Sequence, residues 1–285
     1  MISIYQYQYA VIGGDARQSL ILKKLSATCP CLSFGVPEGS KFSEVSETLE
    51  LAVKNAQNLI LPIPMHKGGN LNLRSECAYH VKEVTGYMRK GQKVYAGCIP
   101  RECRELMSHK GVTYFDYMDQ KEITIYNSIA TAEGMIAEAI SVYPENLHGK
   151  QALILGYGVC GKTLAHKLTG LDVRVCICAR NETALMEANS YGMETMPLSK
   201  LSENIGGYSL IFNTIPAKVV TKEVLHKVNK QAIIFDIASY PYGIDLDAAK
   251  ALSIHTEICM SLPAKYAPVS SSDILTKFIL NGGSL

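Results

Sequence analysis

The length, composition and charge of the chain narrow its possible functions before any motif is considered. It has 285 residues, 47% apolar and 19% charged, so it can bury one large core or two modest ones, and we expect two domains. A formal net charge of +2 gives no field strong enough to favour nucleic acid or an acidic membrane as the partner. A small molecule is the expected ligand.

The sequence also argues against a membrane or an oxidising compartment. The N-terminus, MISIYQYQYA, has neither a basic start nor a continuous apolar stretch, and no later segment approaches the roughly 18 apolar residues of a membrane span. Nine scattered cysteines favour reduced, mostly buried thiols over a metal site. We therefore expect a cytoplasmic protein without a metal.

The first half of the chain alternates strands and helices. Five apolar segments predict strands, at 9–14, 31–35, 58–62, 93–97 and 112–116. Residues 1–127 are therefore predicted to form a smaller N-terminal α/β domain that binds the substrate. A helix over residues 128–142 is expected to bridge the domains, within an interdomain segment at 128–145. Pro144 and Gly149 place the domain boundary just after this helix.

The second half repeats the alternation more regularly. Six apolar segments predict strands, at 151–156, 173–179, 194–196, 209–214, 232–238 and 253–258. Strands without polar alternation, joined by helices, indicate a parallel sheet covered on both faces. Residues 146–268 are thus predicted to form a doubly wound Rossmann domain that binds NAD(P). Residues 269–285 are expected to form a C-terminal helix that packs back between the domains.

The segment GYGVCGKT, residues 156–163, can be interpreted in two ways. As Gly-x-x-x-x-Gly-Lys-Thr it is a phosphate loop, in which Lys162 and Thr163 would hold phosphates and magnesium, with Asp236 as the second magnesium ligand. As Gly156-x-Gly158-x-x-Gly161 it is a dinucleotide fingerprint, in which Val159 and Cys160 also lie near the pyrophosphate. A phosphate loop has no need of Gly158, so the dinucleotide interpretation is favoured.

The end of the second predicted strand indicates which dinucleotide binds. An aspartate or glutamate that would hydrogen-bond the ribose of NAD is absent there, and Arg180 stands in its place, followed by Asn181 and Thr183. A planar cation suits a 2′-phosphate, so NADP is expected in preference to NAD. The alternative is an ordinary solvated arginine before a helix.

The end of the fourth predicted strand is also polar where the cofactor is expected. Asn213, Thr214, Ile215 and Pro216 follow the strand at the sheet edge where such folds line the ribose and nicotinamide. The alternative is that Asn213 and Thr214 only cap the next turn.

Six segments together resemble one known family, the A-subunit family of dipicolinate synthase. They are VIGGDARQ (11–18), IYNSIATAEGMIAEAI (125–140), ILGYGVCGKTLA (154–165), FNTIPAKVV (212–220), FDIASYPYGIDLDAAK (235–250) and LPAKYAP (262–268). The resemblance implies NADP-dependent dehydrogenation of dihydrodipicolinate, from the lysine pathway, to dipicolinate. It also implies that the partner is the flavoprotein-like B subunit of dipicolinate synthase, that the location is the mother cell of a sporulating bacterium, and that the chain forms a homo-oligomer in addition.

A planar ring with two carboxylates requires cations, hydroxyl groups or helix N-termini at two places. Arg17, next to Asp15 at a helix start, suits one place, and Asn127, Ser128 and Thr131 suit the other, although Ser128 could simply cap the helix. The predicted base for the departing proton is Glu133 or Asp15.

Two further residues, Ser239 and Tyr240, follow the fifth strand of the second half, on the cleft side where ligands bind in open α/β sheets. Two other functions stay open at this point. One is a dehydrogenase of another small acid, and the other is a nucleotide-binding regulatory protein without turnover of its own.

Overall fold

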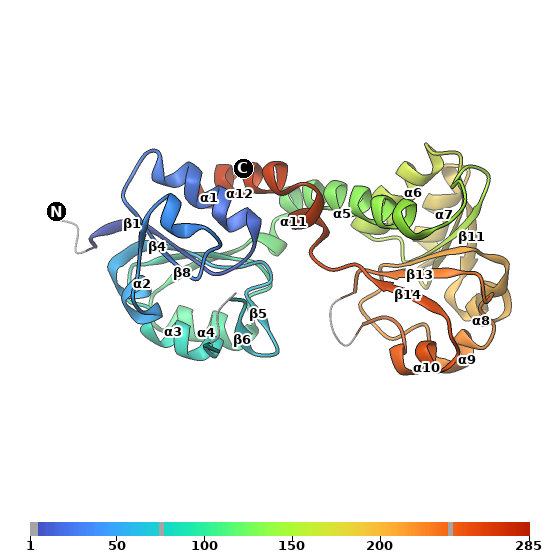
Figure 1. Ribbon diagram of the computed structural model, residues 1–285, viewed down its shortest axis with the longest axis horizontal. Helices are drawn as coiled ribbons and strands as arrows, with labels where there is room; N and C mark the ends of the chain where they lie inside the picture. Colours follow the sequence, from blue (N-terminus) through green and yellow to red (C-terminus); the bar gives the residue numbers. More distant parts are fainter. Residues whose placement is uncertain (1–4, 74–76, 239–241) are drawn as a thin grey trace. The chain divides into compact units, whose positions relative to one another are not determined.

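A computed structural model describes residues 5–73, 77–238 and 242–285 of the chain (Figure 1). Its contacts form two compact units, Met1–Tyr126 together with Ala267–Leu285, and Asn127–Tyr266. Each unit contains a six-stranded parallel sheet with the strand order of a doubly wound nucleotide-binding fold. The expected α/β class is confirmed. The N-terminal unit, expected to be the smaller one, is about as long as the other because the C-terminal residues complete it.

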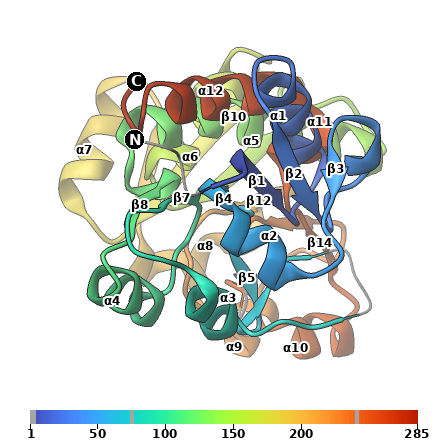
Figure 2. The same cartoon turned by 90° about the vertical axis from the view of Figure 1, so that its left-hand side faces the viewer.

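The sheet of the N-terminal unit runs in the order β3-β2-β1-β4-β7-β8. Its strands are β1 (Tyr7–Ile12), β2 (Cys31–Phe34), β3 (Glu44–Val45), β4 (Ala56–Ile60), β7 (Lys93–Ala96) and β8 (Thr113–Asp116). Helices α1 (Ala16–Ser26) and α12 (Pro268–Leu280) cover one face, and α2 (Leu49–Asn55), α3 (Val81–Tyr87) and α4 (Arg101–His109) cover the other (Figure 2). A separate short hairpin joins β5 (His66–Lys67) to β6 (Asn70–Leu71).

Both faces of the central strands of this sheet are buried, which explains why these strands carry apolar residues on both faces. Along β1, Tyr9 and Val11 pack with α1 and α12, whereas Ala10 and Ile12 pack with α2, α3 and α4. Successive side chains of a strand point to opposite faces, so a strand covered on both sides needs no polar alternation. Phe278 of α12 makes edge-to-face contacts with three aromatic rings of this unit, which attaches the C-terminal helix to it.

The sheet of the second unit runs in the order β11-β10-β9-β12-β13-β14. Its strands are β9 (Gln151–Leu155), β10 (Arg174–Ala179), β11 (Glu194–Pro197), β12 (Leu210–Asn213), β13 (Ile233–Asp236) and β14 (His255–Ile258). One face packs against α5 (Lys121–Val142), α6 (Val159–Thr169), α7 (Glu182–Ser190) and α11 (Leu262–Tyr266). The other packs against α8 (Leu201–Asn204), α9 (Lys222–Leu225) and α10 (Leu246–Ala251).

The long helix α5 starts earlier than its sequence suggests. It begins at Lys121 rather than at residue 128, so Asn127, Ser128, Thr131 and Glu133 lie inside the helix and not at its start. The segment KEITIYN is rich in β-branched residues, which are mediocre helix formers. Ile123 is nevertheless 1% exposed within the core of the N-terminal unit, and this packing outweighs the local preference. Ser128 therefore does not cap the helix.

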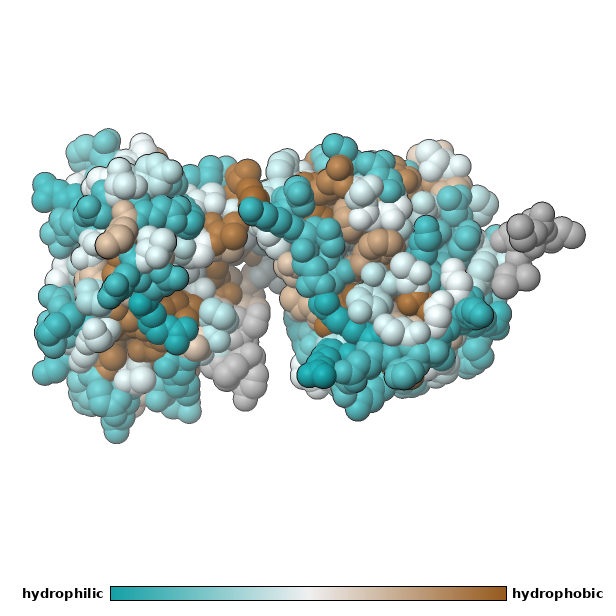
Figure 3. Space-filling view, turned by 180° about the vertical axis from the view of Figure 1, so that it is seen from behind, coloured by the Kyte–Doolittle hydropathy of each residue, from teal (hydrophilic) through white to brown (hydrophobic). Residues whose placement is uncertain are grey.

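Hydrophilic residues cover most of the face drawn in Figure 3, with apolar residues in small groups between them. No helix in the described part of the chain combines the length and the apolar composition that a membrane span requires. All nine cysteines are free thiols and five of them are buried. Burial raises the pKa of Cys178 and of Cys259 to about 12, as expected for thiols that contribute to packing.

Candidate functional site

The glycine-rich loop connects β9 to α6 at the carboxyl edge of the second sheet. Gly156 has a φ of +94°, and a Cβ there would lie 2.6 Å from Thr214 Oγ1. A Cβ on Gly161 would lie 2.3 Å from the carbonyl oxygen of Gly156, so this glycine allows the helix to pack directly on the strand end. A Cβ on Gly158, the residue before the first turn of α6, would meet no atom of residues 5–73, 77–238 or 242–285 within 4 Å.

These three environments match the three separate roles of a dinucleotide fingerprint. The first glycine forms the tight turn, and the third permits close packing of helix and strand. The second keeps open the space in which a pyrophosphate approaches the helix N-terminus, where backbone N–H groups and the helix dipole favour negative charge. Because a Cβ on Gly158 would have no close neighbour among the described residues, no contact in that part of the chain requires a glycine at this position.

The residues that a phosphate loop would use have other partners. Lys162 Nζ lies 2.7 Å from each carboxylate oxygen of Glu187. Thr163 Oγ1 donates to the carbonyl of Val159 at 3.0 Å and lies 2.8 Å from Ser128 Oγ. Asp236 is fully buried among hydrogen-bond donors of the chain itself, as described below. The match to a phosphate loop is therefore coincidental, and the dinucleotide interpretation accounts for the geometry.

Arg180 lies directly after β10, the strand next to β9. Its side chain is exposed, and it has no hydrogen-bond or ion-pair partner among the residues that the structure describes. Asn181 caps α7 by accepting a hydrogen bond from the N–H of Ala184 at 3.3 Å, and Thr183 is exposed in the first turn. The arginine is thus free to bind an anion at the sheet edge where the adenosine half of a dinucleotide lies.

The turn after β12 lies on the other side of the glycine-rich loop. Thr214 and Ile215 are half-buried against Gly156, and Pro216 is exposed. Asn213 is completely buried and its side chain is hydrogen-bonded to the backbone of Ile215 in this turn, so it is not open to a ligand. Strand pairing therefore brings the predicted cofactor residues to one edge of the sheet. They are Gly156, Gly158, Val159, Cys160, Gly161, Arg180, Asn181, Thr183, Asn213, Thr214, Ile215 and Pro216.

The predicted substrate residues of the N-terminal unit form a closed cluster. Asp15 caps α1, and its carboxylate accepts from Arg17 Nε at 2.9 Å and from Arg17 Nη2 at 2.7 Å. Arg17 is 4% exposed and also donates to the carbonyl of Ile63 at 2.8 Å. The N–H groups of Gly13 and Gly14 donate to Phe34 and Asn72. Sequence reasoning missed the partners Ile63, Phe34 and Asn72, which are distant along the chain.

The predicted residues on α5 lie in the second unit. Ser128 is fully buried and bonded to Thr163 of α6, and Thr131 donates to the carbonyl of Asn127 one turn earlier, at 2.9 Å. Glu133 is more accessible, with 53% of its side chain exposed, and one of its oxygens accepts from Lys167 at 2.8 Å. The remaining two predicted residues, Ser239 and Tyr240, lie outside the described residues.

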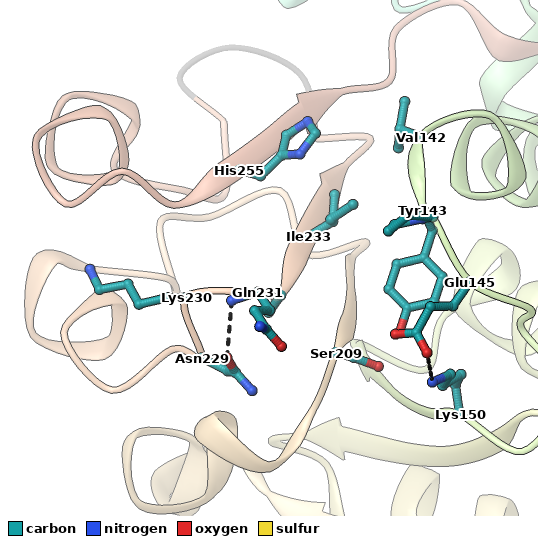
Figure 4. A pocket seen from close by; sticks show the side chains of 12 residues that line it. Val142, Tyr143, Glu145, Lys150, Ser209, Asn229, Lys230, Gln231, Ile233 and His255 are labelled. Atoms are coloured by element: carbon teal, nitrogen blue, oxygen red, sulfur yellow. Dashed lines mark hydrogen bonds and ion pairs between the residues drawn. The ribbon is translucent and has the colours of Figure 1, made fainter.

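A polar cavity of about 620 Å³ opens at the opposite edge of the second sheet (Figure 4). It is lined by residues at the amino ends of β12, β13 and β14, including Ser209, Gln231 and His255, and by the ion pair of Glu145 with Lys150. Ligands of open α/β sheets bind outside the carboxyl ends of the strands. The cavity therefore lies at the wrong edge for the dinucleotide.

Comparison with known proteins agrees with this geometry. A family model described as the N-terminal domain of the A subunit of dipicolinate synthase matches residues 8–118. A second, described as the NAD-binding domain of S-adenosyl-L-homocysteine hydrolase, matches residues 133–275. The second match explains the 26% identity over 130 residues to adenosylhomocysteinase of Haloquadratum walsbyi, which covers 46% of this chain and 30% of that protein.

Two proteins that carry the same name match the chain over nearly its whole length. The A subunit of dipicolinate synthase from Bacillus subtilis is 26% identical over 280 residues, which are 95% of this chain and 93% of that protein. The crystal structure of the corresponding protein from Bacillus halodurans superposes with a TM-score of 0.87 at 29% identity, covering 96% of this chain and 97% of that one. A dehydrogenase-type NAD-binding domain within such relatives supports an oxidoreductase. The chain is thus similar, over nearly its whole length, to the A subunits of dipicolinate synthase.

Proposed function

We propose that this protein is an NADP-dependent dehydrogenase that oxidises dihydrodipicolinate to dipicolinate. The observation that carries the proposal is the glycine-rich loop with the open space over Gly158, in a chain similar to these A subunits. The substrate ring loses one hydride and one proton, and it becomes an aromatic pyridine. When bound, NADP supplies the acceptor for the hydride. The chain's own residues have to orient the ring and receive the proton.

The preference for NADP over NAD rests on Arg180. An exposed guanidinium without a partner among the described residues, at the end of β10, is suited to bind a 2′-phosphate by two parallel hydrogen bonds. A cofactor without the 2′-phosphate would make no ion pair with the guanidinium of Arg180. NAD is therefore the weaker ligand in this proposal.

A titration with NADPH, NADH and Mg-ATP tests both points. The two reduced dinucleotides are followed by their own fluorescence, without a tryptophan signal from the chain, and Mg-ATP is followed by calorimetry. We expect NADPH to bind more tightly than NADH, and Arg180→Glu to weaken NADPH binding by about 10- to 100-fold, corresponding to about 1.4–2.8 kcal/mol, with little change for NADH. Arg174→Glu, an exposed arginine at the amino end of the same strand, is the matched control and should behave as wild type. Tight binding of Mg-ATP without binding of NADPH would overturn the proposal.

For the substrate, we propose that its carboxylates are held by Arg17 and by polar groups of Asn127, Ser128 and Thr131, with Ser239 and Tyr240 as further ligands. Because Arg17 is already bound by Asp15, and Ser128 by Thr163, a carboxylate would have to compete with these partners. Glu133 is our first candidate for the base, since most of its side chain is exposed and Lys167 occupies only one oxygen. Asp15 is the second candidate.

Replacing Glu133 with glutamine tests the assignment of the base. If Glu133 receives the proton, Glu133→Gln should lower kcat by about 10²- to 10⁴-fold and leave the Kd for NADPH within about twofold of wild type. Glu138→Gln is a matched control, because Glu138 lies on the same helix and pairs with Lys265 in the same way. Wild-type turnover by Glu133→Gln would shift the assignment to Asp15, to be tested as Asp15→Asn.

We further propose that the protein acts in the cytoplasm of the mother cell of a sporulating bacterium, on a precursor from the lysine pathway. It would work with the flavoprotein-like B subunit of dipicolinate synthase and form homo-oligomers as well. Support comes from the similarity of the chain to the A subunits of dipicolinate synthase. Copurification of the tagged chain with this partner from sporulating cells, followed by turnover assays with and without the partner, would test the assembly.

A further inference from the structure

A buried carboxylate lies beneath the cofactor edge of the second sheet and takes no part in the roles described so far. Asp236 is the last residue of β13 and is fully buried. Its Oδ1 accepts hydrogen bonds from Asn213 Nδ2 and from the N–H of Ala238, and its Oδ2 accepts one from the N–H of Gly243, each at 2.8 Å. One carboxylate thus holds two points of the chain that follows β13.

Asn213, the last residue of β12, connects Asp236 to the neighbouring strand. It is also fully buried, and its Nδ2 donates to the carbonyl of Ile215 at 3.1 Å in addition to Asp236. Its Oδ1 accepts from the N–H of Ile215 at 3.2 Å. The turn after β12 is therefore closed on one amide group, and that group is oriented by Asp236.

This turn also forms one wall of the glycine-rich loop. Both the N–H and the hydroxyl of Thr214 donate to the carbonyl of Leu155 at 2.9 Å, directly before Gly156. A Cβ on Gly156 would lie 3.0 Å from the side chain of Ile215, so loop and turn are in direct contact. A continuous series of short contacts connects Asp236, through Asn213 and this turn, to the loop.

The choice of these residue types is informative. A buried carboxylate is costly unless donors surround it; here three donors do, and an apolar side chain would leave them without a partner. The carboxylate of Asp236 fixes the positions of the three N–H groups that it binds, because charge-assisted hydrogen bonds are short and strong. Fixed positions of these residues are what a dinucleotide lying across this edge of the sheet would require.

The geometry points to Asp236 and Asn213 as positioning residues for the second, nicotinamide-side half of the dinucleotide site. This inference rests on the proposed function, since it assumes a dinucleotide across the edge formed by β10, β9, β12 and β13. A doubly wound domain binds the two nucleotide halves on two sets of strands. Arg180 serves the adenosine half, whereas Asp236 and Asn213 bind backbone groups of Ile215, Ala238 and Gly243, which follow β12 and β13.

The test compares a whole cofactor with a fragment. Adenosine 2′-monophosphate, which can occupy only the adenosine half, and NADPH are titrated against wild type and Asp236→Asn. Asparagine keeps the shape but brings an NH₂ group toward backbone donors, so the turns lose their fixed positions. We expect the Kd for NADPH to rise about tenfold or more, and the Kd for the fragment to change less than about twofold.

Gly243→Ala provides a second variant that removes no charge. A Cβ on Gly243 would lie 1.9 Å from Asn213 Nδ2, so alanine displaces the amide from its place beside Asp236. The same selective loss of NADPH affinity is expected. If Asp236→Asn does not fold, the NADPH affinity of Gly243→Ala tests the inference instead.

Asp116→Asn is the control for a buried carboxylate outside the cofactor site. Asp116 is 2% exposed and accepts hydrogen bonds from the backbone N–H groups of Cys98, Ile99 and Met118 in the N-terminal unit.

The outcomes separate this inference from the proposed function. Parallel loss of both ligands would mean that the two residues only stabilise the domain, and unchanged NADPH affinity would mean that the turns need no positioning. Either result overturns the inference and leaves the proposed function intact. If wild type prefers NADH, the preference for NADP is wrong and the comparison is made with NADH and adenosine 5′-monophosphate. A wild-type chain that binds neither dinucleotide overturns both.

Discussion

Replacing Gly161 with alanine is expected to abolish NADPH binding and to destabilise the second unit at the same time. The added Cβ would lie 2.3 Å from the carbonyl oxygen of Gly156 and 3.4 Å from Thr214 Oγ1. The first of these atoms belongs to backbone, which cannot rotate away, so α6 has to move off β9. Overpacking of this kind costs about 1–3 kcal/mol in the free energy of unfolding. The same movement displaces the helix N-terminus from the place where phosphates bind.

The control for this variant lies at the other end of the same helix. A Cβ on Gly170 would approach the carbonyl oxygen of Lys167 at 3.4 Å, which is an ordinary contact, and Gly170 has a helical φ of −66°. Gly170→Ala should therefore fold and bind NADPH as wild type does. Urea unfolding followed by circular dichroism, together with NADPH titration, measures both effects. Normal affinity in Gly161→Ala would mean that close packing of helix and strand is not required for binding.

Most strands of both sheets could be predicted because each is a short, apolar run bounded by glycine, proline or polar residues. In β9 the run QALIL ends at Gly156, and burial on both faces removes the need for polar alternation. The beginning of α5 could not be predicted in this way. Its first two turns are stabilised by the burial of Ile123 in the core of the N-terminal unit, and local preference in KEITIYN gives no sign of that contact.

In the candidate site, too, features set by local sequence could be predicted, whereas features that depend on residues far along the chain could not. The glycine-rich loop and Arg180 were predictable, since their spacing along the chain follows from one strand, one turn and one helix. The burial of Asn213 was not, because its partner Asp236 lies 23 residues away in sequence. The closure of Arg17 depends in the same way on the carbonyl of Ile63, 46 residues away. Polar residues at strand ends can face a ligand or hold a turn, and only the packed structure separates the two.

Replacing Gly158 with alanine should separate ligand binding from folding. Its φ of −81° and ψ of −167° suit any residue, and an added Cβ meets no atom of the described residues within 4 Å, so the free energy of unfolding should stay within about 0.5 kcal/mol of wild type.

If a pyrophosphate occupies the open space over Gly158, the same methyl group displaces it, and the Kd for NADPH should rise more than about tenfold. Gly207→Ala, at an equally open position in the same unit, should change neither quantity. Unchanged NADPH affinity in Gly158→Ala would mean that the pyrophosphate does not approach this backbone. A variant that folds normally but loses NADPH would assign Gly158 to the cofactor alone, in contrast to Gly161, whose loss impairs both folding and binding.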